Sequence, residues 1–464
     1  MLSVDKSKNS APLYMQLYKQ IKAEIQDKLR PAGSRLPSKR KLAATLAISV
    51  NTIEAAYGQL VSEGFIEARP QRGYFVCRLD ELQKIELKEA PTLPAQTPLE
   101  QIKIDFSPES IDKEKFPYNT WRRLLKNCFD EYDKALLDCP PAQGFLPLRE
   151  DIASYLYQAR GVHCQPQQVI VGAGTDNLLQ MTSRLLDNRY CLALENPFYP
   201  YAANLFQRVG HEVRFIDVDK HGIRPQALPN LARIAVYVTP SHQFPSGVFM
   251  PINRRIELLN WASDGQERYL IEDDYDSEFR YNARPIASLQ SLDRSGRVIY
   301  LGTFSKAVAP ALRISYMVLP PALLKVYKQR YAAFAPAASG FEQRVLHEFI
   351  SSGAFEAHLN KMRKLYRQKR QLLADSVNSW GKTASIGGEN AGHHLLLRLN
   401  NGLTEEQMCQ QALAARVRVY PLSRYFHSRV PKQYQSTVLL GYAGLSEQQI
   451  TEGAKLLQAA WLNG

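Results

Sequence analysis

Residues 298–316 read VIYLGTFSKAVAPALRISY, and the fold of the chain is best inferred from this stretch. The short apolar run at 298–301 predicts a buried strand. A glycine-led turn follows and carries Lys306, with Arg313 seven residues farther on. A lysine just past a buried strand can lose its hydration, which lowers its pKa toward that of a nucleophilic amine. Taken alone, Lys306 would more often be an ordinary solvated lysine.

Four other apolar runs have the same character. Each is short and nearly continuous, and helical patterns separate one from the next: 169–171, 191–194, 234–238 and 269–271. Such runs are typical of strands buried on both faces in a mainly parallel sheet. Residues 104–464, called the body below, are therefore expected to form an α/β domain. In such sheets ligands bind at the carboxyl ends of the strands.

Polar residues suited to chemistry follow three of these runs. After 169–171 comes GAGTD (172–176), a glycine turn at a predicted helix start, whose free N–H groups suit a phosphate. After 269–271 comes EDDYD (272–276), and acids at a buried strand end must meet a cation or solvent. After 191–194 comes ENPFYP, in which Tyr199 can offer an aromatic face. Glycine turns after strands are common, so the first signal is weak alone.

Together these residues meet the demands of pyridoxal 5'-phosphate (PLP). Its aldehyde needs a lysine amine, its pyridine nitrogen a carboxylate, and its phenolic oxygen a hydrogen-bond donor. Its phosphate needs a helix N-terminus and an arginine, and its ring needs an aromatic face. These groups can come from Lys306, Arg313, Tyr199 and the two polar clusters GAGTD (172–176) and EDDYD (272–276). A PLP site is therefore predicted.

Residues 11–77, called the head below, have a different pattern, which predicts three helices and a hairpin. The apolar residues of the first helix recur at every fourth position, before residues 31–33 end it: Leu13, Leu17, Ile21, Ile25 and Leu29. Ser38 and Ser49 are placed to cap two more helices. Two β-prone runs, 65–68 and 74–76, flank a turn that carries arginines. This order of elements is that of a winged helix-turn-helix.

The third helix and the hairpin carry residues suited to double-stranded DNA. Small polar side chains at a helix start can reach base edges in the major groove, while flanking cations hold phosphates. The candidates for base contact are Val50, Asn51, Thr52 and Ala55, and those for phosphate contact are Lys39, Arg40, Arg69 and Arg72. Taken singly, each is more often an ordinary surface residue.

The charge of the chain is concentrated near its N-terminus. Residues 1–78 hold thirteen Lys and Arg against six Asp and Glu, about half of the net charge of +13. A basic module on a nearly neutral body suits a polyanion, although a solvated basic surface is an equal alternative on charge alone. Residues 78–103 hold three prolines and no glycine and are expected to be an extended linker. As a random coil it would span about 25–30 Å.

The composition excludes several other classes. Apolar residues make up 45% and charged residues 22%, an ordinary globular balance. No apolar run approaches the ~18 residues of a membrane helix, and no secretory signal is recognisable. The six cysteines form no Cys-x-x-Cys pair and no zinc protease motif is present, so neither a metal site nor disulfides are expected. The expected setting is the cytoplasm.

Two groups of motifs resemble known families. PLYMQLYKQIKAEI (12–25) and residues 36–76 resemble the GntR-type DNA-binding domain. ENPFYPYAA, TPSHQFPSG, IEDDYDSEFRY and LGTFSKAVAPALRISY resemble a fold-type I aminotransferase domain. Joined in one chain, they resemble the MocR-type subfamily of GntR regulators. The resemblance implies that the following residues touch DNA: Arg40, Ser49, Asn51, Thr52, Arg72 and Gly73.

The same resemblance implies roles in the body. It makes Lys306 the internal-aldimine lysine, with Asp273 facing the pyridine nitrogen and Tyr275 the phenolic oxygen. It places Tyr199 on the ring face and His242 and Gln243 along the pocket wall. The residues implied around the phosphate are Gly174, Thr175, Thr303, Ser305 and Arg313. Arg424 is the candidate for an effector carboxylate by its position, although an exposed arginine without a role is as good an interpretation.

This chain departs from the family pattern at two positions. Tyr201 stands where the GABA-responsive regulator has a second ligand-binding arginine, so GABA itself is not expected as effector. Cys139 stands where the family commonly has a tyrosine that reaches the partner subunit's cofactor phosphate.

The predicted function is a PLP-dependent, DNA-binding transcription regulator that acts as a head-to-tail homodimer. An amine or amino acid, or PLP itself, would alter operator binding through Lys306. An active aminotransferase with an autoregulatory head is the alternative, because the lysine, acid and tyrosine are all present. A catalytically dead fold used only for dimerisation is a third interpretation.

Overall fold

The computed structural model describes residues 2, 4–5, 11–78, 102–130, 134–281, 287–331, 333–388 and 391–462. The chain divides into two compact units, Met1–Thr97 and Pro98–Gly464. Most of the predicted linker, residues 79–101, lies outside the described residues.

The head contains three helices and a two-stranded antiparallel hairpin, as predicted. The elements are α1 (Leu13–Gln26), α2 (Lys39–Leu46), α3 (Val50–Ser62), β1 (Ile66–Arg69) and β2 (Gly73–Val76). The inner stripe of α3 is fully buried against α1: Ile53, Ala56, Tyr57 and Leu60. The Ser38 and Ser49 hydroxyls accept from the backbone N–H groups of Lys41 and Thr52, so both predicted caps are present. The winged helix-turn-helix prediction is confirmed.

The first helix is shorter than its apolar pattern predicts. It ends at Gln26, and Lys28 has a left-handed backbone conformation with φ of 58°. Leu29 is 73% exposed and makes no part of the core. The prediction that Leu29 continues the buried stripe is wrong, because the chain leaves the helical path one turn before it and before residues 31–33.

The body is built on an eight-stranded sheet in the order β4-β11-β10-β9-β8-β5-β6-β7. Neighbours from β10 through β6 run parallel, while β11 and β7 run antiparallel to theirs, so the mainly parallel α/β prediction is confirmed. The strands are β4 (Val169–Gly172), β5 (Cys191–Asn196), β6 (Val213–Asp219), β7 (Gly222–Ile223), β8 (Arg233–Val238), β9 (Glu267–Asp274), β10 (Val298–Thr303) and β11 (Ser315–Val318).

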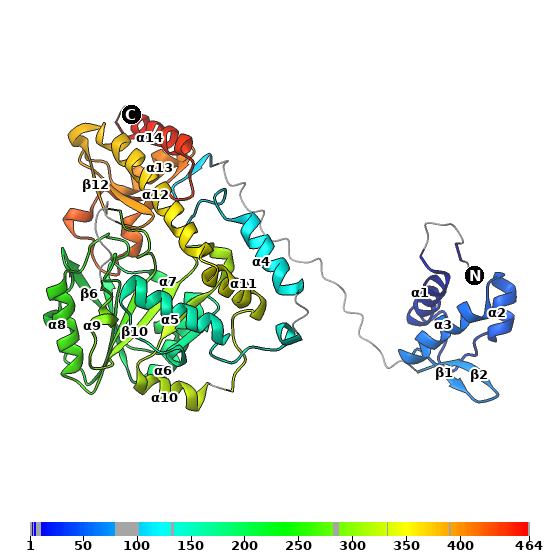
Figure 1. The fold of residues 1–464 in the computed structure, drawn as a ribbon. Coiled ribbons are helices and arrows are strands. Elements are labelled where there is room, and N and C mark those ends of the chain that lie inside the picture. Colours follow the sequence, from blue (N-terminus) through cyan, green and yellow to red (C-terminus); the bar gives the residue numbers. More distant parts are fainter. Residues whose placement is uncertain are drawn as a thin grey trace. The chain divides into compact units, whose positions relative to one another are not determined.

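Helices cover both faces of this sheet, as Figure 1 shows. One face packs on α6 (Thr175–Leu186), α7 (Pro200–Val209) and α10 (Pro321–Arg330). The other face packs on two groups of helices. One group is α8 (Ile252–Ser263) and α9 (Leu289–Leu292), and the other is α5 (Leu146–Arg160), α11 (Gly340–Ser351) and α12 (Ala354–Asn378). The strands are buried on both sides, which explains their continuous apolar runs.

A smaller sheet follows the long helix α12, in the order β12-β13-β16-β15. It lies at the same end of the body as α12, α13 and α14 (Figure 1). Its elements are β12 (Ala384–Gly387), β13 (His394–Leu399), β15 (Tyr420–Pro421), β16 (Thr437–Gly441), α13 (Glu405–Ala414) and α14 (Glu447–Leu462). The first strand of the body, β3 (Ile104–Asp105), pairs in parallel with β14 (Val417–Arg418), and α4 (Tyr118–Asp130) follows it.

Over the ranges that the structure describes, no helix has both the length and the apolar character to cross a membrane.

Arg255 on α8 holds together three chain segments near the carboxyl end of strand β8. Its side chain is fully buried, and its guanidinium donates to the carbonyls of Met250 (3.0 Å), Ala287 (2.7 Å) and Pro240 (2.9 Å). Burial lowers the pKa of Arg255 to about 10. Replacing a buried cation removes several hydrogen bonds at once and leaves their acceptors buried without a donor.

We predict that Arg255→Met lowers the free energy of unfolding by about 3–5 kcal/mol, because three buried carbonyls lose their donor. Urea unfolding of the full chain measures this. Arg189→Met is the matched control, since Arg189 is exposed and, among the described residues, forms its ion pair with Asp187, and it should leave the unfolding midpoint nearly unchanged. Equal midpoints for the two variants would contradict the assignment.

Candidate functional site

A cavity of about 240 Å³ opens at the carboxyl ends of the central strands. It brings together predicted residues from five separate segments: Thr175, Tyr199, Asp273, Tyr275, Thr303, Ser305, Lys306 and Arg313. Asp176 and Asp276, the last residues of the two polar clusters GAGTD and EDDYD, also line it. Sequence reasoning did not select as site residues the other polar and aromatic residues that line it: Glu109, Phe198, Tyr237, Thr239, Phe244, His393 and His394. Tyr237 lies near the carboxyl end of β8, and the tendency of ligands to bind at the carboxyl ends of strands could have identified it.

Lys306 lies just beyond the end of β10, and its Nζ donates to the carbonyl oxygen of Pro108 at 2.8 Å. Burial lowers the pKa of Lys306 to about 8, while the charges of Glu109 and Asp276 act in the opposite direction. A substantial fraction of this amine is therefore neutral near physiological pH, and a neutral amine is the nucleophilic form.

The three acids 272–274 lie within β9 rather than beyond its end, since the strand continues to Asp274. Side chains alternate along a strand, so they do not form one cluster. Glu272 accepts from the N–H groups of Leu289 (2.7 Å) and Gln290 (2.8 Å), and Asp274 pairs with Arg160 at 2.6 Å. Only the middle acid, Asp273, lines the cavity.

Asp273 has no cationic partner among the described residues. Tyr237 Oη donates to it at 2.6 Å. Burial raises the pKa of Asp273 to about 7, the Tyr237 hydrogen bond opposes this, and the charges of Asp274 and Asp276 add to it. A ligand that brings a cationic N–H to this carboxyl would restore its ionised form, because an opposite charge favours ionisation.

His242 and Gln243 do not line the cavity, unlike the sequence-based expectation. His242 lies behind Tyr275 and Asp276: Tyr275 Oη donates to the His242 carbonyl at 2.9 Å, and His242 Nδ1 is 2.8 Å from Asp276 Oδ2. Gln243 turns inward and donates to the carbonyl of Pro197 at 2.9 Å. These bonds hold the turn after β8 so that Phe244 faces the cavity instead.

The helix start at α6 forms one end of the cavity. Gly174 precedes Thr175 with φ of 85°, and a Cβ built on Gly174 would lie 2.6 Å from Arg313 Nη2. Arg313 also pairs with Asp176 at 3.0 Å. Ser315, which sequence reasoning did not select, donates to Thr303 Oγ1 at 2.7 Å, and Thr303 donates to Ser305 at 3.1 Å. Free N–H groups, hydroxyls and a guanidinium at one helix N-terminus suit a phosphate.

A second cavity, of about 270 Å³, adjoins the first and is called the side cavity here. The two share Pro108, Glu109 and Tyr199 in their walls. Arg424 lines the side cavity with four tyrosines: Tyr199, Tyr201, Tyr420 and Tyr425. The structure therefore places Arg424 beside the Lys306 cavity rather than in it. Cys139 is exposed and lines neither cavity.

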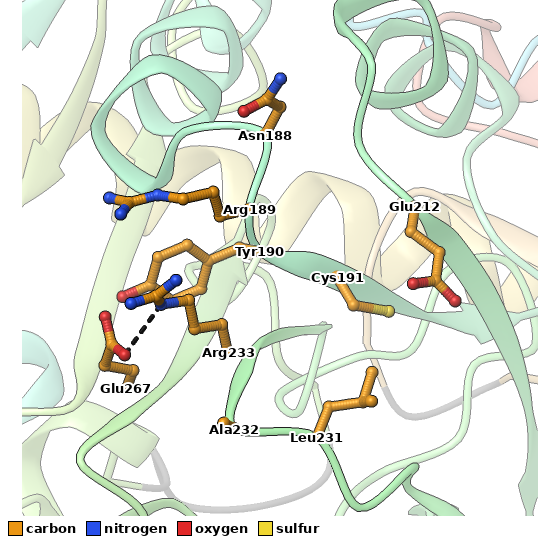
Figure 2. A pocket seen from close by; sticks show the side chains of 9 residues that line it. All are labelled: Asn188, Arg189, Tyr190, Cys191, Glu212, Leu231, Ala232, Arg233 and Glu267. Carbon is orange, nitrogen blue, oxygen red and sulfur yellow. Dashed lines mark hydrogen bonds and ion pairs between the residues drawn. The ribbon is translucent and has the colours of Figure 1, made fainter.

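A larger cavity, of about 370 Å³, lies at the opposite edge of the sheet, around the start of β5, β8 and β9. Figure 2 shows Arg233 paired with Glu267, at 2.8 Å. Arg189 pairs with Asp187 and Glu212 with Arg214, each at 2.6 Å. Its charged groups are thus matched within the fold, and none of the predicted site residues lines it.

The head presents the predicted DNA-binding residues on its surface. Asn51 is exposed in the first turn of α3, and Thr52 Oγ1 is 2.8 Å from the Ser49 hydroxyl. Gly73, with φ of 102°, follows the exposed Arg72 at the hairpin turn, which favours glycine there.

The basic residues of the head differ in their partners. Lys39 pairs with Glu54 at 2.6 Å, and Arg69 Nε donates to Glu67 at 2.7 Å. Arg40 and Arg72 are exposed, and their side chains form no ion pair with a residue that the structure describes. These two arginines are accordingly the best placed for phosphates.

Comparisons with known proteins agree with both halves of the chain. Residues 13–76 match the family described as bacterial regulatory proteins, gntR family, and residues 112–457 match aminotransferase class I and II. The crystal structure of Pyrococcus horikoshii kynurenine aminotransferase in complex with PMP, the amine form of PLP, is similar at a TM-score of 0.69 and 26% identity. The match covers 77% of this chain and 90% of that one.

Curated relatives share the whole arrangement. An uncharacterized HTH-type transcriptional regulator of Bacillus subtilis, YdeL, is 42% identical over 97% of both chains. The probable rhizopine catabolism regulatory protein MocR of Rhizobium meliloti is 33% identical, over 100% of this chain and 96% of its own length. The chain belongs to the MocR-type subfamily of GntR transcription regulators, in which a helix-turn-helix head is joined to a class I and II aminotransferase domain.

Proposed function

We propose that this regulator binds PLP at Lys306, and that an amine or amino acid reaching this site, or PLP itself, changes its affinity for a DNA operator. The observation that carries the proposal is the pairing of two groups in one cavity: a lysine amine with a lowered pKa and a carboxyl, Asp273, that lacks a cation. A regulator of this kind would act in the cytoplasm, where its DNA and its cofactor are found.

The cavity residues fit PLP at each of its polar ends. Asp273 can accept from the pyridine N–H, and Tyr275 can donate to the phenolic oxygen once its single O–H turns away from the His242 carbonyl. The absence of a side chain at Gly174 lets the Arg313 guanidinium pack against the start of α6, where a phosphate could bind between Arg313, Thr175, Thr303 and Ser305. Tyr199 and Phe244 supply aromatic walls.

When bound, PLP would supply an aldehyde that reacts reversibly with primary amines. The residues of the cavity would have three roles. Burial keeps the Lys306 amine partly neutral, and Asp273 is held where a cation on the ligand can ionise it. The aromatic walls narrow access to the cavity. His242 and Asp276 keep the Tyr275 hydroxyl in place. A ligand that occupies the Lys306 amine also removes its hydrogen bond to Pro108, and Pro108 lies only seven residues after the undescribed linker segment.

The side cavity is the proposed site for the remainder of an effector, with Arg424 as partner for a carboxylate. Its volume of about 270 Å³ exceeds that of the Lys306 cavity, and its tyrosine walls suit an organic group. Tyr201 supplies no second cation, so recognition of the acid would rest on Arg424 alone.

We propose that two bodies associate as a head-to-tail homodimer. Exposed apolar side chains gather on the elements around α4 and α11, where Phe129 stacks on Phe341 with ring centroids 5.5 Å apart. The large exposed apolar and aromatic residues on these elements, on the neighbouring 3-10 helix η1 (Lys134–Leu137) and on α5 are Tyr118, Leu125, Phe129, Leu137, Leu146, Tyr157 and Phe341. Apolar patches of this kind mark protein interfaces.

We predict that the full chain loaded with PLP and then desalted is yellow, and that Lys306→Ala removes the long-wavelength band, because Lys306 is the one lysine among the described residues that line the cavity. Absorption spectroscopy measures this, and borohydride reduction followed by mass spectrometry locates the adduct. Lys325→Ala, which removes an exposed lysine of α10, should keep the band. A wild-type protein that takes up no PLP would sink the proposal.

The rate at which the cofactor-free chain captures PLP should rise as the pH passes about 8, because the neutral Lys306 amine is the reactive form. The charge of Glu109 raises the pKa of Lys306, so Glu109→Gln lowers that pKa and moves the midpoint to lower pH. Stopped-flow absorbance across pH gives the midpoint. Glu356→Gln, on the exposed side of α12, is the control. A midpoint that moves upward in Glu109→Gln would disprove the electrostatic account.

DNA binding should depend on the head residues without affecting the cofactor. With duplexes selected from a random pool by the wild-type chain, Asn51→Ala should lower the affinity about tenfold, the size of a lost base contact. Arg72→Ala should weaken binding to all sequences and reduce the salt dependence by about one phosphate contact. Fluorescence anisotropy measures both, and Arg189→Ala serves as an equal charge change on the body. Unchanged affinity in both head variants would show that another face binds DNA.

A further inference from the structure

His393 is a buried side chain whose two ring nitrogens have no hydrogen-bond partner in the part of the chain that the structure describes. It is 2% exposed, and neither Nδ1 nor Nε2 makes a hydrogen bond with any residue that the structure describes. Its ring is held by Phe279 and Tyr366, with centroids 4.5 Å and 4.7 Å away. Unpaired buried polar atoms destabilise a fold and are rare, so a fixed ring of this kind requires an explanation.

The explanation lies in where the ring stands. His393 lines the cavity that contains Lys306 and Asp273. Burial lowers the pKa of His393, and the charge of Lys306 is the largest electrostatic contribution in the same direction, followed by those of His394 and His242. The ring is therefore neutral, with one N–H to donate and one nitrogen to accept.

The neighbouring His394 provides an internal comparison. It is equally buried and lines the same cavity, yet its Nε2 lies 3.2 Å from the Pro245 carbonyl oxygen. Two adjacent histidines thus share one environment, and only one of them is satisfied by the fold. The unsatisfied ring forms part of the cavity wall that a ligand would contact.

We propose that His393 binds the effector and favours amines that carry an oxygen on the carbon next to the amine carbon, as 2-amino acids and 2-amino alcohols do. The proposal rests on the proposed function, since the effector amine reacts where Lys306 stands. An oxygen close to that amine reaches the same cavity wall and accepts the His393 N–H. A plain alkylamine of equal shape leaves the ring unpaired.

The experiment uses three amines with one carbon skeleton: L-alanine, 2-aminopropan-1-ol and isopropylamine. The full chain loaded with PLP is titrated with each, and the half-maximal concentration for the change in absorption is recorded. In His393→Phe this concentration should rise about tenfold for the two oxygen-bearing amines, the size of one hydrogen bond, and less than about twofold for isopropylamine. His393→Asn, which keeps a donor and an acceptor, should recover most of the loss.

Thermal unfolding of the cofactor-free chain provides a second readout. His393→Phe should leave the midpoint unchanged or raise it, because it removes unpaired polar atoms. His394→Phe is the matched control and should lower the midpoint, because it breaks the contact with Pro245.

Three results would overturn the proposal. One is an equal loss of thermal stability in the two phenylalanine variants, which would make His393 structural. Another is an unchanged ratio of half-maximal concentrations among the three amines in His393→Phe. The last is a PLP-loaded wild-type chain that responds to none of them. Failure to take up PLP at all would instead contradict the proposed function, and the thermal comparison would still decide whether His393 is structural.

Discussion

A buried carboxyl either finds a cation or is driven toward its neutral form, and the site of this regulator depends on how β9 meets that constraint. Three consecutive acids lie on the strand. Backbone N–H groups at the start of α9 donate to both oxygens of Glu272, and Arg160 pairs with Oδ2 of Asp274. Among the described residues, the donor to Asp273 is the Tyr237 hydroxyl alone. The period of two along a strand thus leaves one acid in the cavity with capacity for a cation.

Lys306 complements Asp273 through the same physical cause. Burial disfavours the charged form of either group, so it lowers the pKa of the amine to about 8 and raises that of the carboxyl to about 7. Both groups therefore titrate close to neutral pH. A ligand with a cationic N–H at one end and an amine-reactive carbon at the other would interact with both at once, which is the pairing that PLP requires.

Much of this could be predicted from the sequence, because local patterns determine it. Strands buried on both faces produce continuous apolar runs, and serines at 38 and 49 cap helices through contacts three residues away. Local patterns could not identify Pro108, Glu109 and His393 as site residues. Only the tertiary fold brings them to the Lys306 cavity, because Pro108 and Glu109 lie nearly 200 positions before Lys306 and His393 lies nearly 100 positions after it. Leu29 shows the opposite error. Its spacing predicted a place in the buried stripe of the first helix, but that helix ends at Gln26 and Leu29 is exposed.

The position of Pro108 gives the Lys306 cavity a direct connection with the chain that leads to the head. Backbone bonds anchor this segment to the C-terminal part of the body: Lys103 N–H donates to Arg416, Phe106 N–H to Arg418, and Gly441 N–H to Phe106. Just beyond these anchors, the Pro108 carbonyl accepts from Lys306, and Glu109 lines both cavities. Occupation of the amine therefore changes a contact on the first described segment of the body. A regulator needs differential contacts between its states, and this hydrogen bond is one that a ligand at Lys306 must alter.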